Sequence, residues 1–399
     1  MTRPVPRASV AVLLAALVAF QSVSTDLYLP ALPAIVVDLA TGVEEIQLTL
    51  SLFLMGFGAG QLLWGPLSDR FGRRPALLAG LAAYVAAAAG CALAPGIAVL
   101  VALRLLQGIA AAVGPSVGRA VVRDLWAPAE AGRVLGYLAA AMALGPMLGP
   151  ILGGWLTERL GWRAAFWALA AFGTLVLAAT LRVLPETVPA RDAGALAPRR
   201  LLAAWRTVLA HPLFRASVLA AALSYGGIFV WISGSPHLLV GVLGMSPGAY
   251  GLAFALSVVG YMSGSFLGAR LSRRFGPTLP FRLGGPLAAL AGLAAALVLA
   301  RLPATAAGIL PFAFATMLAA GFVLPAAMAA SLAPFPERAG LASGLLGALQ
   351  LAIASGIGYG VAAAFDGTAR PMGIAWALVG LATLAAATLT ARRLRHLLG

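Results

Sequence analysis

Charged, metal-binding and disulfide-forming side chains are all scarce in this sequence. Only 10% of the 399 residues are charged, none is a lysine, one is a cysteine (Cys91) and three are histidines (His211, His237 and His396). A lone cysteine cannot form a disulfide within the chain, and neither an H-E-x-x-H nor a phosphate-binding P-loop pattern is present. We therefore expect no metal and no cofactor. His237 is expected to be solvated at the outer surface. These absences argue against an enzyme and against pumping driven by ATP.

Apolar residues make up 61% of the chain. A soluble domain is about 45–50% apolar and about 25% charged, so most of this protein must be surrounded by lipid. One span of the hydrocarbon core takes roughly 20 residues, and the length therefore fits twelve helices. We predict an all-α integral membrane protein made of two pseudo-symmetric bundles of six transmembrane helices. The predicted helices cover residues 9–32, 47–67, 76–94, 97–122, 133–157, 163–183, 213–239, 247–270, 279–300, 305–331, 338–363 and 370–391.

The segment 185–212 is the only long polar stretch, and it predicts a cytoplasmic linker between a first bundle (1–184) and a second bundle (213–399). If the N-terminus is cytoplasmic, most of the 27 arginines fall in cytoplasmic connections. Only Arg159, Arg163, Arg301 and Arg370 then lie on the outer side. In membrane proteins, arginine and lysine are enriched in the cytoplasmic connections, so both termini are predicted to be cytoplasmic. The net charge of +15 needs no nucleic-acid partner.

A short repeat supports the two halves. The sequence L-S-D-R-F-G at 67–72 recurs as L-S-R-R-F-G at 271–276, each copy after the second predicted helix of its half. Parallel halves of six helices are a known plan for transporters. Arg273 replaces Asp69 in the second copy, so we expect no equivalent acidic contact there.

Two charged residues lie where lipid should surround the chain. Asp26 falls about six residues from the outer end of the first helix, and Arg104 about seven residues inside the fourth, which puts both roughly 9–10 Å deep. A charge at the bilayer centre costs about 2.5–3.5 kcal/mol on insertion scales. We expect the two groups to pair, directly or through water. Asp26 is predicted to gain and lose a proton as a cavity opens to either side; the alternative is a purely structural ion pair.

The loop at 65–75 reads G-P-L-S-D-R-F-G-R-R-P. Glycines at 65 and 72 permit a tight turn at the membrane surface. Asp69 can accept hydrogen bonds from a helix N-terminus or from an arginine, whereas Arg70 and Arg73 alone would only set the orientation. We predict that Asp69 holds the cytoplasmic side in one state.

This loop resembles the signature G-x-L-x-D-R-x-G-R of the major facilitator superfamily, and the resemblance extends over the whole chain. Arg104 matches the superfamily's R-x-x-Q-G pattern in the fourth helix. The fifth helix reads G-P-M-L-G-P-I-L-G-G at 145–154, similar to the pattern of the antiporter branch, which implies exchange without leak. The alternative is a plain packing interface of small residues. The residues that match the antiporter pattern are Gly145, Pro146, Gly149, Gly153 and Gly154.

A narrower resemblance is to the bicyclomycin/chloramphenicol-resistance (Bcr/CflA) efflux group. It rests on T-D-L-Y-L-P-A-L-P at 25–33, G-Q-L at 60–62, V-R-D at 122–124 and S-G-S-P at 233–236. The match at 122–124 directs attention to the end of the fourth helix, with Arg119, Arg123 and Asp124. In that group the acid of the first helix is thought to bind protons, substrate or both, a role that the resemblance places on Asp26.

The resemblance implies a monomeric, proton-coupled antiporter of a bacterial inner membrane that exports small hydrophobic drugs. Export of an endogenous sugar or amino acid is the alternative. A receptor is disfavoured because no soluble sensing domain is present. Aromatic and amide side chains that could line a cavity are weaker candidates, since each is also compatible with simple packing. They are Tyr28, Gln47, Tyr225, Phe229, Trp231, Tyr261 and Gln350.

Overall fold

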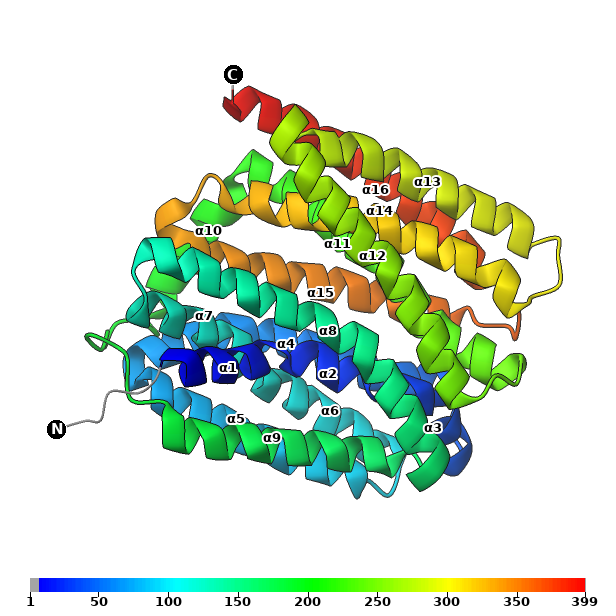
Figure 1. The fold of residues 1–399 in the computed structure, drawn as a ribbon, viewed down its shortest axis with the longest axis horizontal. Helices are drawn as coiled ribbons and strands as arrows, with labels where there is room; N and C mark the ends of the chain where they lie inside the picture. Colours follow the sequence, from blue (N-terminus) through cyan, green and yellow to red (C-terminus); the bar gives the residue numbers. More distant parts are fainter. Residues whose placement is uncertain (1–6, 399) are drawn as a thin grey trace.

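The computed structural model describes residues 7–398, apart from the side chains at positions 7, 128, 129, 131, 133, 135, 139–144 and 398. Its helices lie side by side in two groups, blue to green and green to red in Figure 1. The first group holds α1 (Arg7–Val18), α2 (Phe20–Asp26), the 3-10 turn η1 (Leu29–Ala31), α3 (Leu32–Asp38), α4 (Val43–Phe71), α5 (Arg73–Ala92), α6 (Ile97–Ala111), α7 (Val113–Leu125), α8 (Pro128–Leu160) and α9 (Arg163–Val183). The second holds α11 (Pro212–Ser235), the π-helical η2 (Pro236–Val242), α12 (Pro247–Phe275), α13 (Leu279–Leu299), α14 (Ala306–Leu332), the 3-10 turn η3 (Pro336–Arg338), α15 (Ala339–Ala363) and α16 (Arg370–Leu398).

The membrane spans agree with the prediction. Ten helical segments are long and apolar enough to cross a bilayer, and the bent α1–α3 region supplies an eleventh. α8, with 33 residues, is the twelfth. The all-α membrane fold in two bundles is confirmed. We call the end that carries the α3–α4 and α11–α12 connections the outer end, following the arginine distribution.

The first span is broken, and the prediction of one helix over 9–32 is wrong in this respect. Its two parts, Ala8–Val18 and Phe20–Asp38, meet at an angle of 41°. The Ser22 hydroxyl group donates to the carbonyl of Ala19, the residue between the two parts, which competes with helical hydrogen bonds. Pro30 and Pro33 then lack the N–H that an unbroken helix needs. Asp26 therefore sits at the end of a helix instead of within one.

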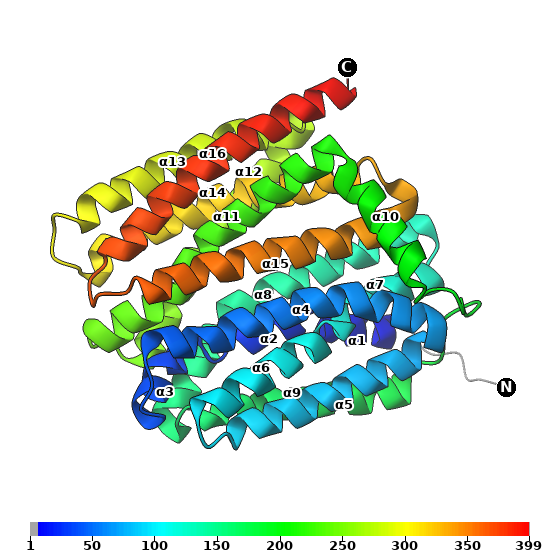
Figure 2. The same ribbon diagram turned by 180° about the vertical axis from the view of Figure 1, so that it is seen from behind.

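The linker at 185–212 was predicted as a polar connection, without a helix. The structure places one helix in it, α10 (Pro198–Ala210). Proline at the first helical position and apolar residues three or four apart favour this helix. The predicted boundaries between the halves, at 184/185 and 212/213, fall near the end of α9 and the start of α11. Figure 2 shows α10 next to the ends of α11 and α15.

The repeat of residues 67–72 and 271–276 has the same backbone geometry in both halves. Gly72 and Gly276 end α4 and α12 with φ of +109° and +92°, a conformation that other residues rarely adopt. The N–H of each glycine donates to the carbonyl of the serine four residues earlier, Ser68 or Ser272. The duplication read from the sequence thus reappears as a duplicated helix end.

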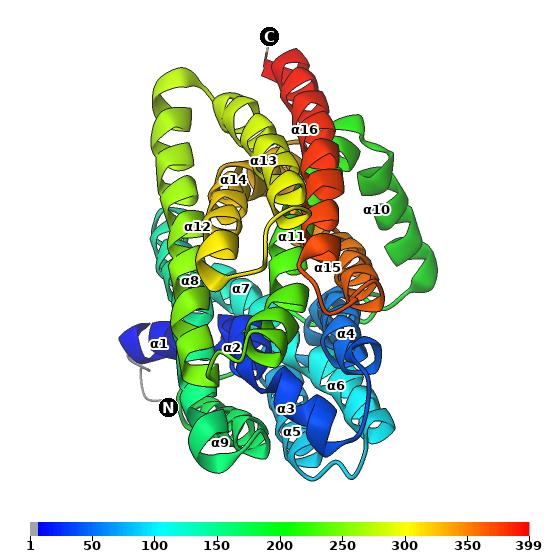
Figure 3. The same cartoon turned by 90° about the vertical axis from the view of Figure 1, so that its right-hand side faces the viewer.

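Two pairs of helices join the halves. α4 packs along α15, and α8 packs along α12, as Figures 1 and 3 show. At the outer end, the backbone N–H of Gly248 donates to Glu158 over 2.8 Å, and Tyr359 donates to Glu44. These contacts bring the outer ends of the two halves together around the broken first span.

Candidate functional site

Asp26 is the last residue of α2 and is buried between helices, with 4% of its surface exposed. Its Oδ1 accepts a hydrogen bond from the hydroxyl group of Thr25 at 3.0 Å. Gln21, earlier on the same helix, donates to the hydroxyl group of Tyr225 at 3.4 Å, and α12, which carries Tyr250, packs along α8 beside Asp26. Tyr225 and Tyr250 belong to the second half, so Asp26 lies where the two halves meet.

The glycines of the antiporter pattern bring α8 against Asp26 and its neighbours. A methyl group placed on three of these glycines would overlap the first span. The overlaps are Gly145 with Ser22 Oγ at 2.3 Å, Gly149 with Asp26 Cβ at 2.9 Å, and Gly153 with the carbonyl oxygen of Leu27 at 1.8 Å. Gly154 instead faces the second half, where a methyl group would lie 2.3 Å from the carbonyl oxygen of Pro247. Two motifs that are far apart in the sequence therefore form one interface, and Pro146 lies within α8 beside it.

Further polar contacts cross between the halves near this interface. The Gln21 side-chain amide donates to the hydroxyl group of Tyr225 at 3.4 Å. The Gln47 amide donates to Ser233 Oγ at 2.9 Å, and its oxygen atom is buried without a partner. Such an unsatisfied buried group is available to a ligand or to water. Gln21, Ser233 and Tyr250 were not among the predicted site residues; a polar residue within an apolar span was the available signal.

Arg104 is fully buried inside the first half and does not pair with Asp26. No ion pair within 4 Å joins these two described side chains, so the predicted direct pairing is wrong for this conformation. The guanidinium donates to the carbonyl oxygens of Ser24 and Thr49 at 3.2 and 3.3 Å and to Gln107 Oε1 at 2.8 Å. Its Nη2 has no hydrogen-bond partner among the described residues. Aromatic faces enclose the cation: those of Tyr28, Phe53 and Phe166, at 4.3, 4.2 and 5.8 Å.

The helix geometry explains why the two charges miss each other. Ser24 and Tyr28 are four residues apart and face Arg104, whereas Asp26, halfway between them, faces away toward α8. Similar depth in the membrane was therefore not sufficient to bring the charges together.

A network of charges surrounds Arg73 at the end of the first half that lies opposite the outer end. Its guanidinium contacts Asp69 at 2.5 Å, Ser68 at 2.8 Å and Asp124, at the end of α7, at 3.0 Å. In this conformation the partner of Asp69 is thus an arginine of its own loop. The predicted holding role of Asp69 remains a prediction, because it concerns a second state.

Glu186 in the linker extends this network. Its carboxylate accepts hydrogen bonds from the backbone N–H groups of Arg73, Arg74, Thr187 and Val188 over 2.8–3.3 Å. Partial burial by itself would raise the pKa of Glu186, but the N–H donors outweigh it and lower the pKa from its ordinary value near 4.5. The charged form is favoured because it lies at the N-terminus of α5, where helix N–H groups are unpaired.

We expect Glu186→Gln to lower the stability of the purified protein at pH 7 by about 1 kcal/mol, a modest value because the group is partly solvated. A lowered pKa means that the carboxylate stabilises the fold above pH 4.5 and stops doing so as the pH falls through the folded value. The melting temperatures of variant and wild type should therefore converge in acid. Glu337→Gln, in the exposed turn η3, is the matched control and should melt like the wild type at every pH. A constant difference between Glu186→Gln and wild type down to acid pH would contradict this assignment.

The other residues of the 65–75 loop and of the end of α7 make fewer contacts with the network around Arg73. Arg70 is exposed and lies over the ring of Phe71. No described atom lies near the position of a Cβ at Gly65, so packing does not require glycine there. Arg123 approaches Gly340 of the second half, and the charge of Arg119 acts on it. In the second half, Arg273 makes no ion pair with any described residue.

The predicted cavity residues fall into two sets. Gln47 and Tyr225 lie at the contact between the halves, whereas Phe229 packs within the second half, on Tyr225 at 5.9 Å and on Gly358. Tyr261 on α12 is partly buried. Gln350 on α15 is buried and has no hydrogen bond to a described residue. Tyr28 and Trp231 are instead enclosed in their own halves, Tyr28 against Arg104 and Trp231 stacked between Phe254 and Trp376.

His237 is buried and not solvated as expected, with 4% of its surface exposed. It lies in η2, a π-helical continuation of the seventh span that touches η1 and α3. Its Nε2 has no partner, and its ring packs on Phe365 at 6.1 Å. The contacts of η2 with η1 and α3 bury this end of the span, and no local pattern predicts them.

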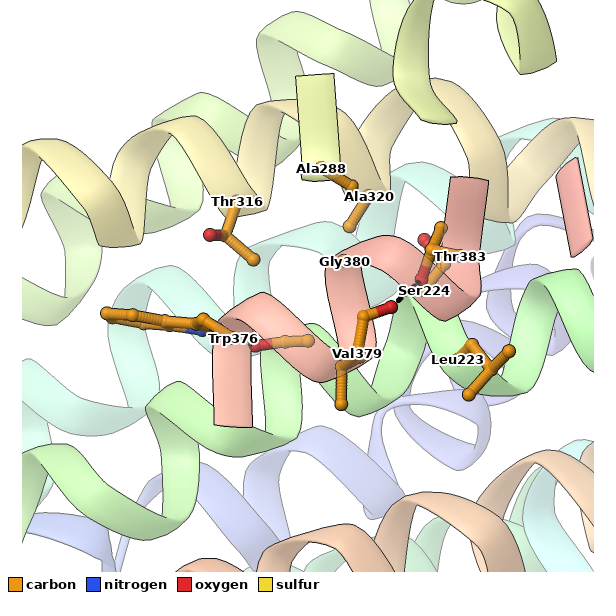
Figure 4. A pocket seen from close by; sticks show the side chains of 10 residues that line it. Leu223, Ser224, Ala288, Thr316, Ala320, Trp376, Val379, Gly380 and Thr383 are labelled. Carbon is orange, nitrogen blue, oxygen red and sulfur yellow. Dashed lines mark hydrogen bonds between the residues drawn. The ribbon is translucent and has the colours of Figure 1, made fainter. Parts of the chain in front are cut away.

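A small cavity lies inside the second half, between α11, α13, α14 and α16 (Figure 4). Ser224 and Thr316 line it with hydroxyl groups that have no partner. Its volume of about 10 Å³ suits one water molecule. A drug-sized ligand needs roughly 300 Å³ or more, so this cavity is not a substrate site. No group of three metal-binding side chains occurs among the described residues.

Twelve spans in two joined halves, with an acid at their contact, define a polytopic α-helical membrane transporter. The Major Facilitator Superfamily model matches residues 12–359, and the chain belongs to this superfamily of transporters. Its multi-pass membrane character follows from the same evidence.

The chain is 29% identical to the bicyclomycin resistance protein homolog of Haemophilus influenzae over 382 residues, which is 93% of each chain. It is 32% identical to the multidrug resistance protein MdtL of Escherichia fergusonii over 345 residues, 84% of each chain. The chloramphenicol resistance protein of Pseudomonas aeruginosa is 35% identical over 270 residues, 66% of this chain and 62% of that protein. The crystal structure of a D-xylose-proton symporter is similar in fold, with a TM-score of 0.73 over 95% of each chain and 17% identity.

Proposed function

We propose that this protein exports small, moderately hydrophobic drugs from the bacterial cytoplasm in exchange for protons. The names of the bicyclomycin, chloramphenicol and multidrug resistance relatives support drug export. The observation that carries the proton coupling is Asp26, a buried carboxyl group at the contact between both halves that pairs with no described arginine. An ionisable group inside a membrane protein that is not held in an ion pair is suited to bind and release a proton.

The surroundings of Asp26 explain how a proton and a drug could compete. Thr25 donates to the carboxyl group, and the hydroxyl group of Tyr225 reaches the same helix from the other half, at Gln21. When the halves separate on one side, water reaches the carboxyl group and stabilises its charge; when they close, the neutral form is favoured. Drug contacts with the aromatic rings would form in the same opening.

Drug-susceptibility tests in an efflux-deficient host examine the proposal. Expression of the chain should raise resistance to several unrelated drugs, and a proton uncoupler should restore their accumulation. In vesicles with an imposed pH gradient, addition of a drug should dissipate the gradient, because protons are exchanged for the drug. If no drug is exported but one intracellular metabolite is depleted, the protein exports a metabolite. If drug export continues in the presence of the proton uncoupler, coupling to proton exchange is refuted.

A further inference from the structure

The linker helix α10 carries two different stripes. One stripe, with Trp205 and Val208, packs onto the second half, where Val208 is fully buried and α10 contacts α11 and α15. At the end of α10, His211 packs edge-on against Phe335 at 5.4 Å, which fixes the helix to the loop before α15. The rotation of α10 about its axis is therefore determined by packing.

The second stripe faces away from the protein and alternates arginine with leucine. Arg199, Leu202, Arg206 and Leu209 follow one another at intervals of three or four residues, which puts them on one side of the helix. Leu202 is 54% exposed and Leu209 37% exposed, and both arginines are exposed. Within the part of the chain that the structure describes, neither Arg199 nor Arg206 forms an ion pair. Arg200 points elsewhere on α10 and pairs with Asp192 at 2.7 Å.

The position of α10 places this stripe at the membrane surface. α10 ends at Ala210 and the seventh span begins at Pro212, so the helix lies at the level where that span enters the membrane. Seen along the long axis of the bundle, α10 lies at the margin of the molecule beside α15 and α16, and not over its centre (Figure 3). No other described part of the chain covers this side of α10, which is therefore open to the surrounding lipid.

We propose that the outer stripe of α10 binds the anionic phospholipid surface of the cytoplasmic leaflet. Arg199 and Arg206 would contact lipid phosphates, while Leu202 and Leu209 enter the boundary between headgroups and acyl chains. A helix with basic and apolar residues interleaved on its exposed side binds at this depth, and each arginine adds electrostatic attraction to anionic lipid. Unpaired arginines and exposed leucines on one side fit a negatively charged surface with an apolar interior, which no uncharged lipid provides.

Binding of phosphatidylglycerol and phosphatidylcholine to the purified full chain, titrated in detergent and read by native mass spectrometry, tests this inference. We expect wild type to prefer phosphatidylglycerol. Each of Arg199→Gln and Arg206→Gln should weaken that binding by roughly fivefold, and the double variant by roughly 25-fold at low salt. Arg200→Gln, on the same helix but already paired with Asp192, is the matched control and should bind like wild type. Leu202→Ser with Leu209→Ser should weaken binding of both lipids.

The melting temperature of each variant shows that it is folded, since the substituted side chains are exposed. Equal binding by wild type and the Arg199/Arg206 double variant overturns the proposal. So does an equal loss in Arg200→Gln, which would indicate a general effect of charge. Binding of a polyglutamate peptide as tight as that of phosphatidylglycerol would instead identify an acidic protein as the partner of α10. None of these outcomes depends on which substrate is transported.

Discussion

Asp26→Asn is expected to abolish proton-driven export while leaving the amount of folded protein in the membrane unchanged. Asparagine has the same shape as aspartate and keeps an oxygen that can accept the hydrogen bond from Thr25. It cannot gain or lose a proton in the physiological range. Resistance should therefore fall to the level of cells without the transporter, and drug addition should no longer release the pH gradient in vesicles.

Asp38→Asn is the control for this experiment. Asp38 lies at the outer end of the same span, is exposed, and pairs with Arg163 at 2.7 Å, so its loss should change export little. Exchange of labelled for unlabelled drug in the absence of a pH gradient separates the two roles of Asp26. If exchange persists in Asp26→Asn, the carboxyl group serves the proton; if exchange is lost too, it also binds the drug. Wild-type export by Asp26→Asn would remove this residue from the mechanism.

Gly153→Ala is expected to destabilise the protein and stop transport. The added methyl group would lie 1.8 Å from the carbonyl oxygen of Leu27, a rigid main-chain atom at the end of α2. α8 must then move away from Asp26, at a cost that overpacked cores put at about 1–3 kcal/mol. A lower melting temperature in detergent and loss of drug export should be seen together.

Gly136→Ala provides the matched control on the same helix. No described atom lies within 4 Å of its added methyl group, and alanine favours helix by about 1 kcal/mol over glycine. The control should therefore melt at or above the wild-type temperature and transport normally. Equal melting temperatures for Gly153→Ala and Gly136→Ala would show that the close approach of α8 to Leu27 is absent from the protein in solution.

Gly149→Ala addresses the alternative that the glycines serve packing alone. Its methyl group would meet Asp26 Cβ at 2.9 Å, a smaller overlap than that of Gly153→Ala, and α8 or the first span must shift to relieve it because Cβ is bonded to the main chain. If the glycines only pack, the folded variant should remain a coupled exchanger. A variant that melts near the wild type but dissipates a pH gradient without drug would support the role in preventing leak.

The main errors of the sequence-based predictions concern directions around helices. The depth of Asp26 and Arg104 followed from counting residues, but the side of the helix on which each one points did not. Arg104 is enclosed by Tyr28, Phe53 and Phe166, from three segments that only folding brings together. His237 was placed wrongly for the same reason, and for Trp231 the packing alternative holds, since an apolar span looks alike whether it faces lipid, a bundle core or the other half.

The sequence by itself determined that this chain spans a membrane twelve times, that its two halves are related, and which superfamily it belongs to. Those properties depend on apolar length and on local motifs such as the repeated glycine turns at 72 and 276, which are encoded over a few adjacent residues. Only the tertiary structure decided that the glycines of α8 pack on Asp26 and its neighbours, and that Arg104 does not pair with Asp26. It also decided that one side of α10 is not covered by the described chain. These are contacts between residues far apart in the chain, and their distances depend on the packing of whole helices, which no local pattern contains.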